Sequence, residues 1–134
     1  MMVKDLISKG TLIAQVYDMN AMNGTSFPTL ESATFQFGFG QISENKVLIP
    51  HIHKRVKREI ETTSEFLYVI HGEMIIDILD EEERFIEKVI LKDNMALLQF
   101  IGGHKIEIKS GTKYFEIKQG PYYGRDFDKY NVKY

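Results

Sequence analysis

The chain alternates apolar and polar residues with a period of two over most of its length. Successive side chains of a β-strand point to opposite faces, so this alternation is typical of strands with one buried face. Turn-forming residues separate the runs about every ten residues, which indicates an antiparallel sandwich or barrel. A short helix is expected only near residues 3–8. The expected strands are 11–17, 33–42, 65–71, 73–79, 85–91, 95–100, 104–109 and 113–118.

Two polar residues fall on apolar faces of these expected strands. Glu65 opens the strand 65–71 and shares a face with Leu67 and Val69. The other face of this strand is also apolar, so we expect both faces to be covered and Glu65 to be at least partly buried. His104 opens the strand 104–109 and shares its face with two isoleucines, whereas the opposite face is charged. Both residues are therefore expected to point inward.

A buried carboxylate needs a compensating partner. An unpaired buried charge costs several kcal/mol, whereas a whole domain is stable by only about 5–15 kcal/mol. A proton, a basic side chain or a metal would neutralise Glu65, and a structural metal site contributes on the order of 10 kcal/mol. His51 and His53 are two residues apart, so a strand would present both on one face. Each histidine alone is explained as well by a surface or core position, but together with Glu65 and His104 they indicate a metal site.

The spacing of these residues resembles the two motifs of the cupin superfamily. In the first motif, roughly G-x5-H-x-H-x3-4-E-x6-G, the corresponding residues are Gly40, His51, His53, Glu65 and Gly72. The second motif survives as Lys92-Asp93, an apolar run and Gly102-Gly103-His104, without its proline. The resemblance covers about residues 30–120. It implies an all-β fold with a single jelly-roll barrel over 1–134 and a tyrosine-rich tail at 121–134.

The resemblance also implies a ligand set and a kind of substrate. His51, His53, Glu65 and His104 would hold one divalent ion. Such nitrogen and oxygen ligands suit Fe, Mn, Ni, Zn or Co without choosing among them. The insert 54–64 is longer than the motif allows, which leaves Glu59 and Glu61 as alternative carboxylate ligands. The segment 116–122 resembles the end of small bacterial cupins associated with surface-polysaccharide (O-antigen) biosynthesis, which favours a sugar-related ligand.

Three functions fit these features. The first is a metal-dependent enzyme for a small polar metabolite such as a sugar or nucleotide sugar, with isomerase, epimerase and dioxygenase chemistry all open. The second is a non-catalytic small-molecule or carbohydrate-binding protein with a structural metal. The third is a metal-free barrel that uses histidine as acid and base, which requires a His–Asp or Tyr pair. No catalytic residue is identified, and the candidate substrate contacts are Arg55, Lys118, Gln119 and Tyr122.

The composition of the chain limits the classes of partner and the cellular location that we expect. The net charge of -2 argues against nucleic acid or an anionic membrane surface as the main partner. The chain contains no cysteine, and it shows neither a signal-peptide pattern nor an apolar run long enough to span a bilayer. We therefore expect a soluble cytoplasmic protein. The strands 11–17 and 35–39 are expected to offer sheet edges for a homodimer.

Overall fold

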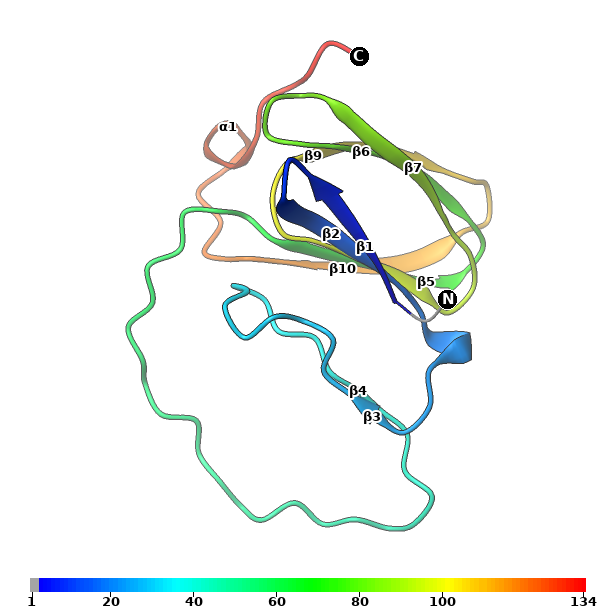
Figure 1. Cartoon of the computed structure of the whole chain (residues 1–134), viewed down its shortest axis with the longest axis vertical. Coiled ribbons are helices and arrows are strands. Elements are labelled where there is room, and N and C mark those ends of the chain that lie inside the picture. Colours follow the sequence, from blue (N-terminus) through cyan, green and yellow to red (C-terminus); the bar gives the residue numbers. More distant parts are fainter. Residues whose placement is uncertain (1–2) are drawn as a thin grey trace.

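The computed structural model describes residues 3–134 and shows two antiparallel sheets that face each other (Figure 1). The five-stranded sheet has the order β1 (Val3–Ser8), β2 (Thr11–Asp18), β8 (Met95–Gln99), β5 (Glu65–His71) and β10 (Lys113–Lys118). The three-stranded sheet has the order β7 (Phe85–Leu91), β6 (Met74–Leu79) and β9 (Gly103–Ile108). The remaining elements are η1 (Met19–Ala21), β3 (Thr25–Ser26) paired with β4 (Phe39–Gly40), and α1 (Arg125–Asp128).

The expected all-β class is confirmed, and most strand positions agree with the alternation pattern. Neither large sheet closes on itself within residues 3–134. On one side β1 lies against β7, where Lys4 pairs with Glu87. On the other side β9 and β10 are both edge strands and are connected by a short turn at 109–112. The sandwich therefore has two unpaired edges on this side.

The main core lies between the two sheets. Leu67, Leu97, Met74 and Ile76 come from both sheets and are almost completely shielded from solvent. Burial of such a side chain contributes about 1.5–3 kcal/mol, so this cluster stabilises the stacking of the sheets. The alternation seen in these parts of the sequence exists because β1, β2 and β5 to β9 each contribute side chains to this cluster.

A second apolar layer covers the outer face of the five-stranded sheet. Phe37 stacks on Tyr17 at 4.4 Å between ring centroids and on Phe66 at 5.3 Å. Phe35 and Phe39 pack against the same cluster. The prediction that β5 is apolar on both faces because both are covered is confirmed for most of its length.

Two local predictions were wrong. Residues 3–8 form the strand β1 and not a helix, because the tight turn at Lys9 and Gly10, with φ of 48° and 78°, folds them back onto β2. A short apolar run does not by itself distinguish the two structures. The expected strand 33–42 is reduced to Phe39–Gly40. Its alternating phenylalanines reflect packing onto the sheet and not pairing within it.

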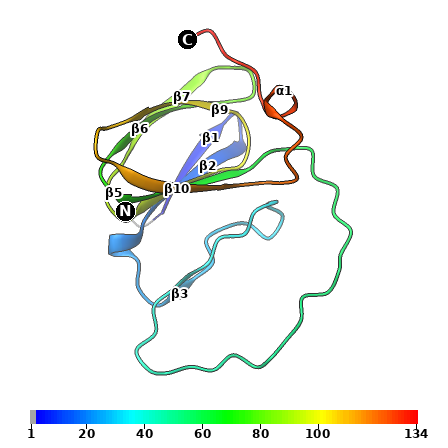
Figure 2. The same cartoon turned by 180° about the vertical axis from the view of Figure 1, so that it is seen from behind.

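Residues 41–63, which we call the arm, lie outside both sheets. The arm leaves β4, swings away from the body and returns to β5 (Figures 1 and 2). Its return point is fixed by Ser64, which is fully buried and donates to the carbonyl oxygen of Phe100 at 3.2 Å. The metal-site hypothesis requires His51 and His53 to lie on a strand, but their segment forms no strand in this structure.

None of the helices among the described residues is both long and apolar enough to cross a membrane.

Candidate functional site

The two inward-pointing polar residues expected from the sequence meet between the sheets. Glu65 begins β5, where it lies opposite Gln99 of β8 and Lys118 of β10. His104 comes from β9 in the facing sheet. The Glu65 Oε2 and His104 Nε2 atoms are 4.0 Å apart, and the two side chains are 20% and 24% exposed. The fold thus brings together a carboxylate and an imidazole from distant parts of the chain.

Gln99 determines which nitrogen of His104 carries the hydrogen. The Gln99 amide nitrogen donates to the carbonyl oxygens of Ile101 at 3.1 Å and Gly103 at 2.8 Å. Its amide oxygen is therefore the group that faces His104 Nδ1, at 2.6 Å, and it accepts the hydrogen of that nitrogen. In the neutral imidazole this leaves the lone pair on Nε2, the nitrogen nearer Glu65.

Burial favours this neutral imidazole. It lowers the pKa of His104 below its ordinary value, against the opposing influence of the Glu116 charge. A histidine that donates its one ring N–H to an oxygen, and keeps the lone pair of the other nitrogen free, has the arrangement typical of metal-binding histidines. His104 is thus oriented to donate a lone pair toward Glu65.

Glu65 is held in an environment that favours its neutral form. Burial is the main cause, and hydrogen bonding and charge repulsion from Glu116 add to it. Together they raise the pKa of Glu65 from 4.5 to about 7, although Lys118 and Lys129 act in the opposite direction. Two carboxylates, Glu65 and Glu116, therefore lie at this end of the sandwich, with Lys118 and Lys129 as the nearby cations.

The C-terminal tail lies over this end of the sandwich. Lys118 pairs with Asp128 of α1 at 3.2 Å, and its ammonium lies 4.9 Å from the ring centroid of Tyr122. Gln119 holds the chain beside the site, because its backbone N–H donates to the Ser64 carbonyl at 2.9 Å. Three of the four candidate substrate contacts therefore lie near Glu65, as a role in binding substrate at this site requires. They are Lys118, Gln119 and Tyr122.

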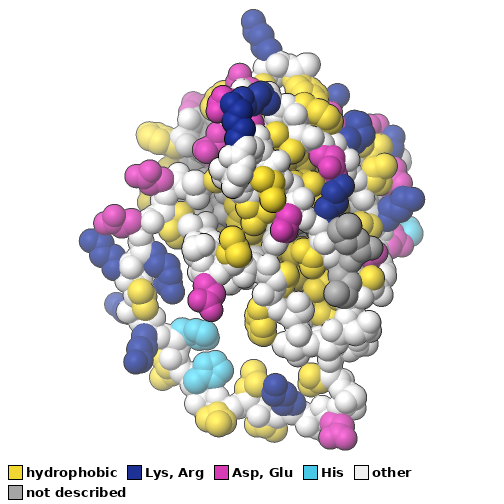
Figure 3. Space-filling model, in the orientation of Figure 1, with side chains coloured by type: hydrophobic (Ala, Val, Ile, Leu, Met, Phe, Trp, Pro, Cys, Tyr) yellow, Lys and Arg dark blue, Asp and Glu magenta, His cyan; other side chains and the backbone are white. Residues whose placement is uncertain are grey.

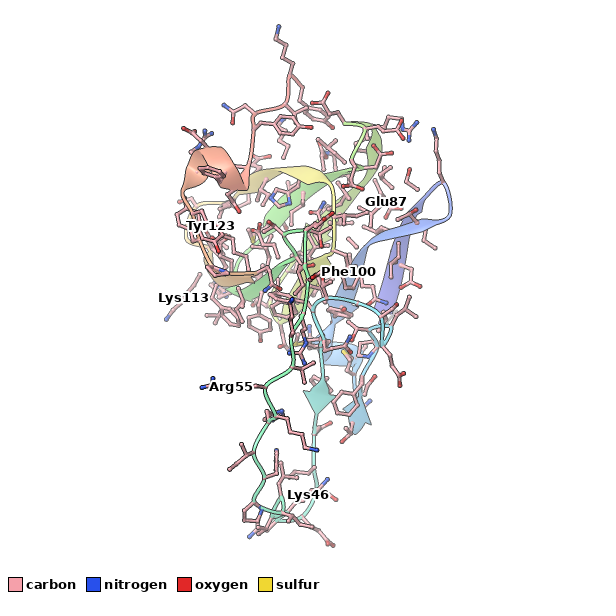
Figure 4. All side chains as sticks on the ribbon, turned by 90° about the vertical axis from the view of Figure 1, so that its left-hand side faces the viewer. Lys46, Arg55, Glu87, Phe100, Lys113 and Tyr123 are labelled. Atoms are coloured by element: carbon pink, nitrogen blue, oxygen red, sulfur yellow. The ribbon has the colours of Figure 1, made fainter. Side chains whose placement is uncertain are left out.

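The structure does not bring His51 and His53 to this pair. Both side chains are exposed on the arm, where their rings are 5.3 Å apart, and Figure 3 shows the arm histidines away from the body. Arg55 also lies on the arm, and Figure 4 shows it far from the labelled Tyr123. The alternative ligands Glu59 and Glu61 are exposed there as well.

Of the four residues expected to form the metal site, the structure therefore brings together two, Glu65 and His104. No group of three or more possible metal-binding side chains occurs within residues 3–134. The ligand atoms of a tetrahedral ion are about 3.4 Å apart, given bonds of about 2.1 Å. The pair formed by Glu65 and His104 fits two positions around one ion after a small inward shift. A single chain in this conformation does not supply the other two.

The remaining histidine lies elsewhere. His71 Nδ1 is 3.2 Å from Asp93 Oδ2 at the opposite end of β5, with side chains that are 75% and 60% exposed. The same Asp93 accepts a hydrogen bond from the Gly72 N–H at 2.7 Å. The pair stabilises the turn after β5. The metal-free hypothesis requires a His–Asp or Tyr pair in the pocket, and this His–Asp pair is on the surface instead.

Sequence reasoning missed two residues of the site. Gln99 has a usable signal, because it is a polar residue at the end of an apolar run and shares the inner face of β8 with Leu97. For Glu116 the sequence signal is misleading. Phe115 and Ile117 form the apolar face of β10, so the pattern predicts that they point inward and that Glu116 points outward. In the structure those two residues face outward and Glu116 lies on the side of Glu65. Comparison with protein-family models, curated proteins and solved structures finds no match.

Proposed function

We propose that this chain is a cupin-like protein that binds a divalent metal ion through Glu65 and His104 and acts on a small polar metabolite related to sugars. The observation that carries the proposal is the 4.0 Å approach of these two side chains from facing sheets. The orientation of His104 by Gln99 supports it, because Nε2 is left free on the side of Glu65. His51 and His53 are the further ligands in this proposal.

The residues around the pair have separate tasks. Gln99 holds the His104 ring and its tautomer, and Glu65 supplies a carboxylate oxygen after it releases its proton on metal binding. Lys118 and Tyr122 offer a cation and an aromatic face to an oxygen-rich ligand. The bound ion would supply Lewis-acid chemistry toward a substrate oxygen or toward O2. Isomerase, epimerase and dioxygenase activities all belong to this proposal, and the jelly-roll barrel and a homodimer are part of it.

A metal titration tests the proposal. Purified metal-free protein is titrated with Mn²⁺, Co²⁺, Ni²⁺, Zn²⁺ and, under anaerobic conditions, Fe²⁺, and the bound ion is quantified by elemental analysis. We expect about one ion per chain, and at least a tenfold loss of affinity in Glu65→Gln and in His104→Gln, as expected when a ligand is removed. Glu107→Gln on the outer face of β9 and His71→Gln at the exposed end of β5 are matched controls.

The outcomes separate the alternatives. Binding of no ion, or equal binding by all four variants, contradicts the proposal. If a metal binds, turnover in a panel of sugars, nucleotide sugars and hydroxy acids distinguishes the enzyme from a carbohydrate-binding protein with a structural metal. The lack of cysteine agrees with action in the reducing cytoplasm.

A further inference from the structure

The described chain has an unpaired extended segment and unpaired sheet edges at the same time. The edges belong to β9 and β10, on either side of the Glu65–His104 pair. An unpaired edge presents backbone N–H and C=O groups that pair readily with another strand. The arm forms no strand in this structure, and beyond Gln41, whose N–H donates to the Gly24 carbonyl oxygen at 2.9 Å, its backbone has no backbone partner among the described residues.

The arm is unusually apolar for an exposed segment. Val47, Ile49 and Ile52 are 89%, 84% and 92% exposed. Each such side chain would gain about 1.5–3 kcal/mol from full burial. The hydrogen bonds and ion pairs that the arm side chains make within the described residues stay inside the arm, as in the 2.7 Å contact between His51 Nδ1 and the Ile49 carbonyl. The arm is thus built to be covered by something outside its present surroundings.

The sequence of the arm matches the edge of β9 in antiparallel register. The inner face of β9 carries, in chain order, His104, Ile106 and Ile108. Read in the reverse direction, alternate residues of the arm are His51, Ile49 and Val47. Antiparallel pairing in this register places histidine beside histidine and apolar residues beside Ile106 and Ile108, the second of which is 43% exposed. Cross-strand pairs of this kind stabilise a sheet.

Charge favours the same placement. The arm continues into the basic residues Lys54, Arg55, Lys57 and Arg58. The end of the sandwich that it would reach carries Glu65 and Glu116, while Lys118 is engaged with Asp128. A segment rich in basic residues therefore meets an end that carries these two carboxylates.

We propose that the arm of one chain adds a strand to the β9 edge of a second copy, reciprocally, and so delivers His51 and His53 to the partner's pair of ligands. The arm that pairs with a β9 edge comes from a second copy, because the arm of a single chain lies on the side of the five-stranded sheet, away from its own β9 edge (Figures 1 and 2). Pro50 keeps this direction, since proline fixes its own φ and favours an extended conformation at Ile49. In a reciprocal exchange, each arm pairs with the β9 edge of the other copy, and one two-fold axis relates the two pairings.

The evidence for the exchange of arms is the free β9 edge, the register between the arm and β9, and the basic residues of the arm. Only the delivery of metal ligands rests on the proposed function. The two parts are therefore tested separately, with the full-length chain in each case.

Sedimentation velocity tests the exchange. Wild type is expected to be a dimer, and Ile49→Asp is expected to raise the dimer dissociation constant by roughly 100-fold, as loss of a central apolar contact does. Phe85→Asp is the matched control, because Phe85 is 53% exposed but lies on β7, at the opposite edge of the three-stranded sheet from β9. A monomeric wild type, or an Ile49→Asp protein that stays dimeric, overturns the exchange. Circular dichroism verifies that both variants are folded.

Complementation tests the delivery of ligands. The double variants His51→Gln/His53→Gln and Glu65→Gln/His104→Gln carry different affinity tags and are expected to bind no Ni²⁺ tightly when each is alone. The mixed dimer, isolated through both tags, contains one intact site and should bind half the Ni²⁺ of wild type. Wild-type binding without recovery in the mixed dimer means that each arm serves its own chain and overturns delivery between copies. No binding by wild type overturns the proposed function and leaves the sedimentation result standing.

Discussion

Glu65→Gln should remove a pH-dependent loss of stability from the metal-free protein. In the folded protein the Glu65 carboxyl keeps its proton up to about pH 7, whereas in the unfolded chain it loses the proton near pH 4.5. Between these values the folded state binds more protons than the unfolded state. Stability therefore falls as the pH rises through this interval, and the loss is complete above pH 7. Glutamine resembles the neutral acid and does not titrate.

The size of the effect follows from the two pKa values. Each pH unit between them is worth about 1.4 kcal/mol, so the interval from 4.5 to about 7 corresponds to about 3 kcal/mol. The Glu65 side chain is only 20% exposed, so solvent screening reduces this figure modestly. We expect Glu65→Gln and wild type to be equally stable at pH 4, and the variant to be more stable by about 2–3 kcal/mol at pH 8.

Urea denaturation from pH 4 to pH 8, followed by circular dichroism, measures the difference between the two proteins. His104 contributes an opposite trend, since its lowered pKa makes stability fall as the pH drops below 6.5, but this trend is present in both proteins. Glu81→Gln, at an exposed position in the turn after β6, is the control. A difference between Glu65→Gln and wild type that is constant within about 0.5 kcal/mol across this range would refute the reasoning.

Two further predictions concern the fold itself. Leu97→Ala, at a fully buried position of β8, should lower the free energy of unfolding by about 2–5 kcal/mol in urea, and a loss below 1 kcal/mol would show that this core is loosely packed. Gly102 has a φ of +86°, and a Cβ there would lie 2.3 Å from the carbonyl oxygen of Leu79. Gly102→Ala should therefore lower the melting temperature clearly more than Gly111→Ala, because Gly111 has a φ of +81° but open space around it. Equal losses of melting temperature in the two variants would argue against the close approach at Gly102.

The sequence predicted those parts of the fold that depend on local alternation. The strands 65–71, 85–91 and 113–118 have the expected bounds. The inward orientation of Glu65 and His104 follows from parity, because a strand buried on one face repeats every two residues. Alternation reports burial and not pairing, which is why the phenylalanines of 33–42 looked like a strand although they cover a sheet.

The sequence also did not predict which sheet edges remain free. The strand expected at 11–17 is present as β2, but it lies between β1 and β8 and offers no free edge. The expected edge at 35–39 packs face-on against Tyr17 and Phe66. The free edges on the side of the site belong to β9 and β10, and strand order is decided by contacts between residues far apart in the chain.

The sequence by itself determined that this protein is all-β, that a carboxylate and a histidine point into its core, and that a second pair of histidines lies on one short segment. Only the tertiary structure decided that Glu65 and His104 meet while His51 and His53 stay outside, and that Gln99 sets the tautomer of His104. The physical reason is that residue spacing fixes the face on which a side chain lies. The neighbours that it meets there depend on how separate strands pack and on which sheet edges remain free.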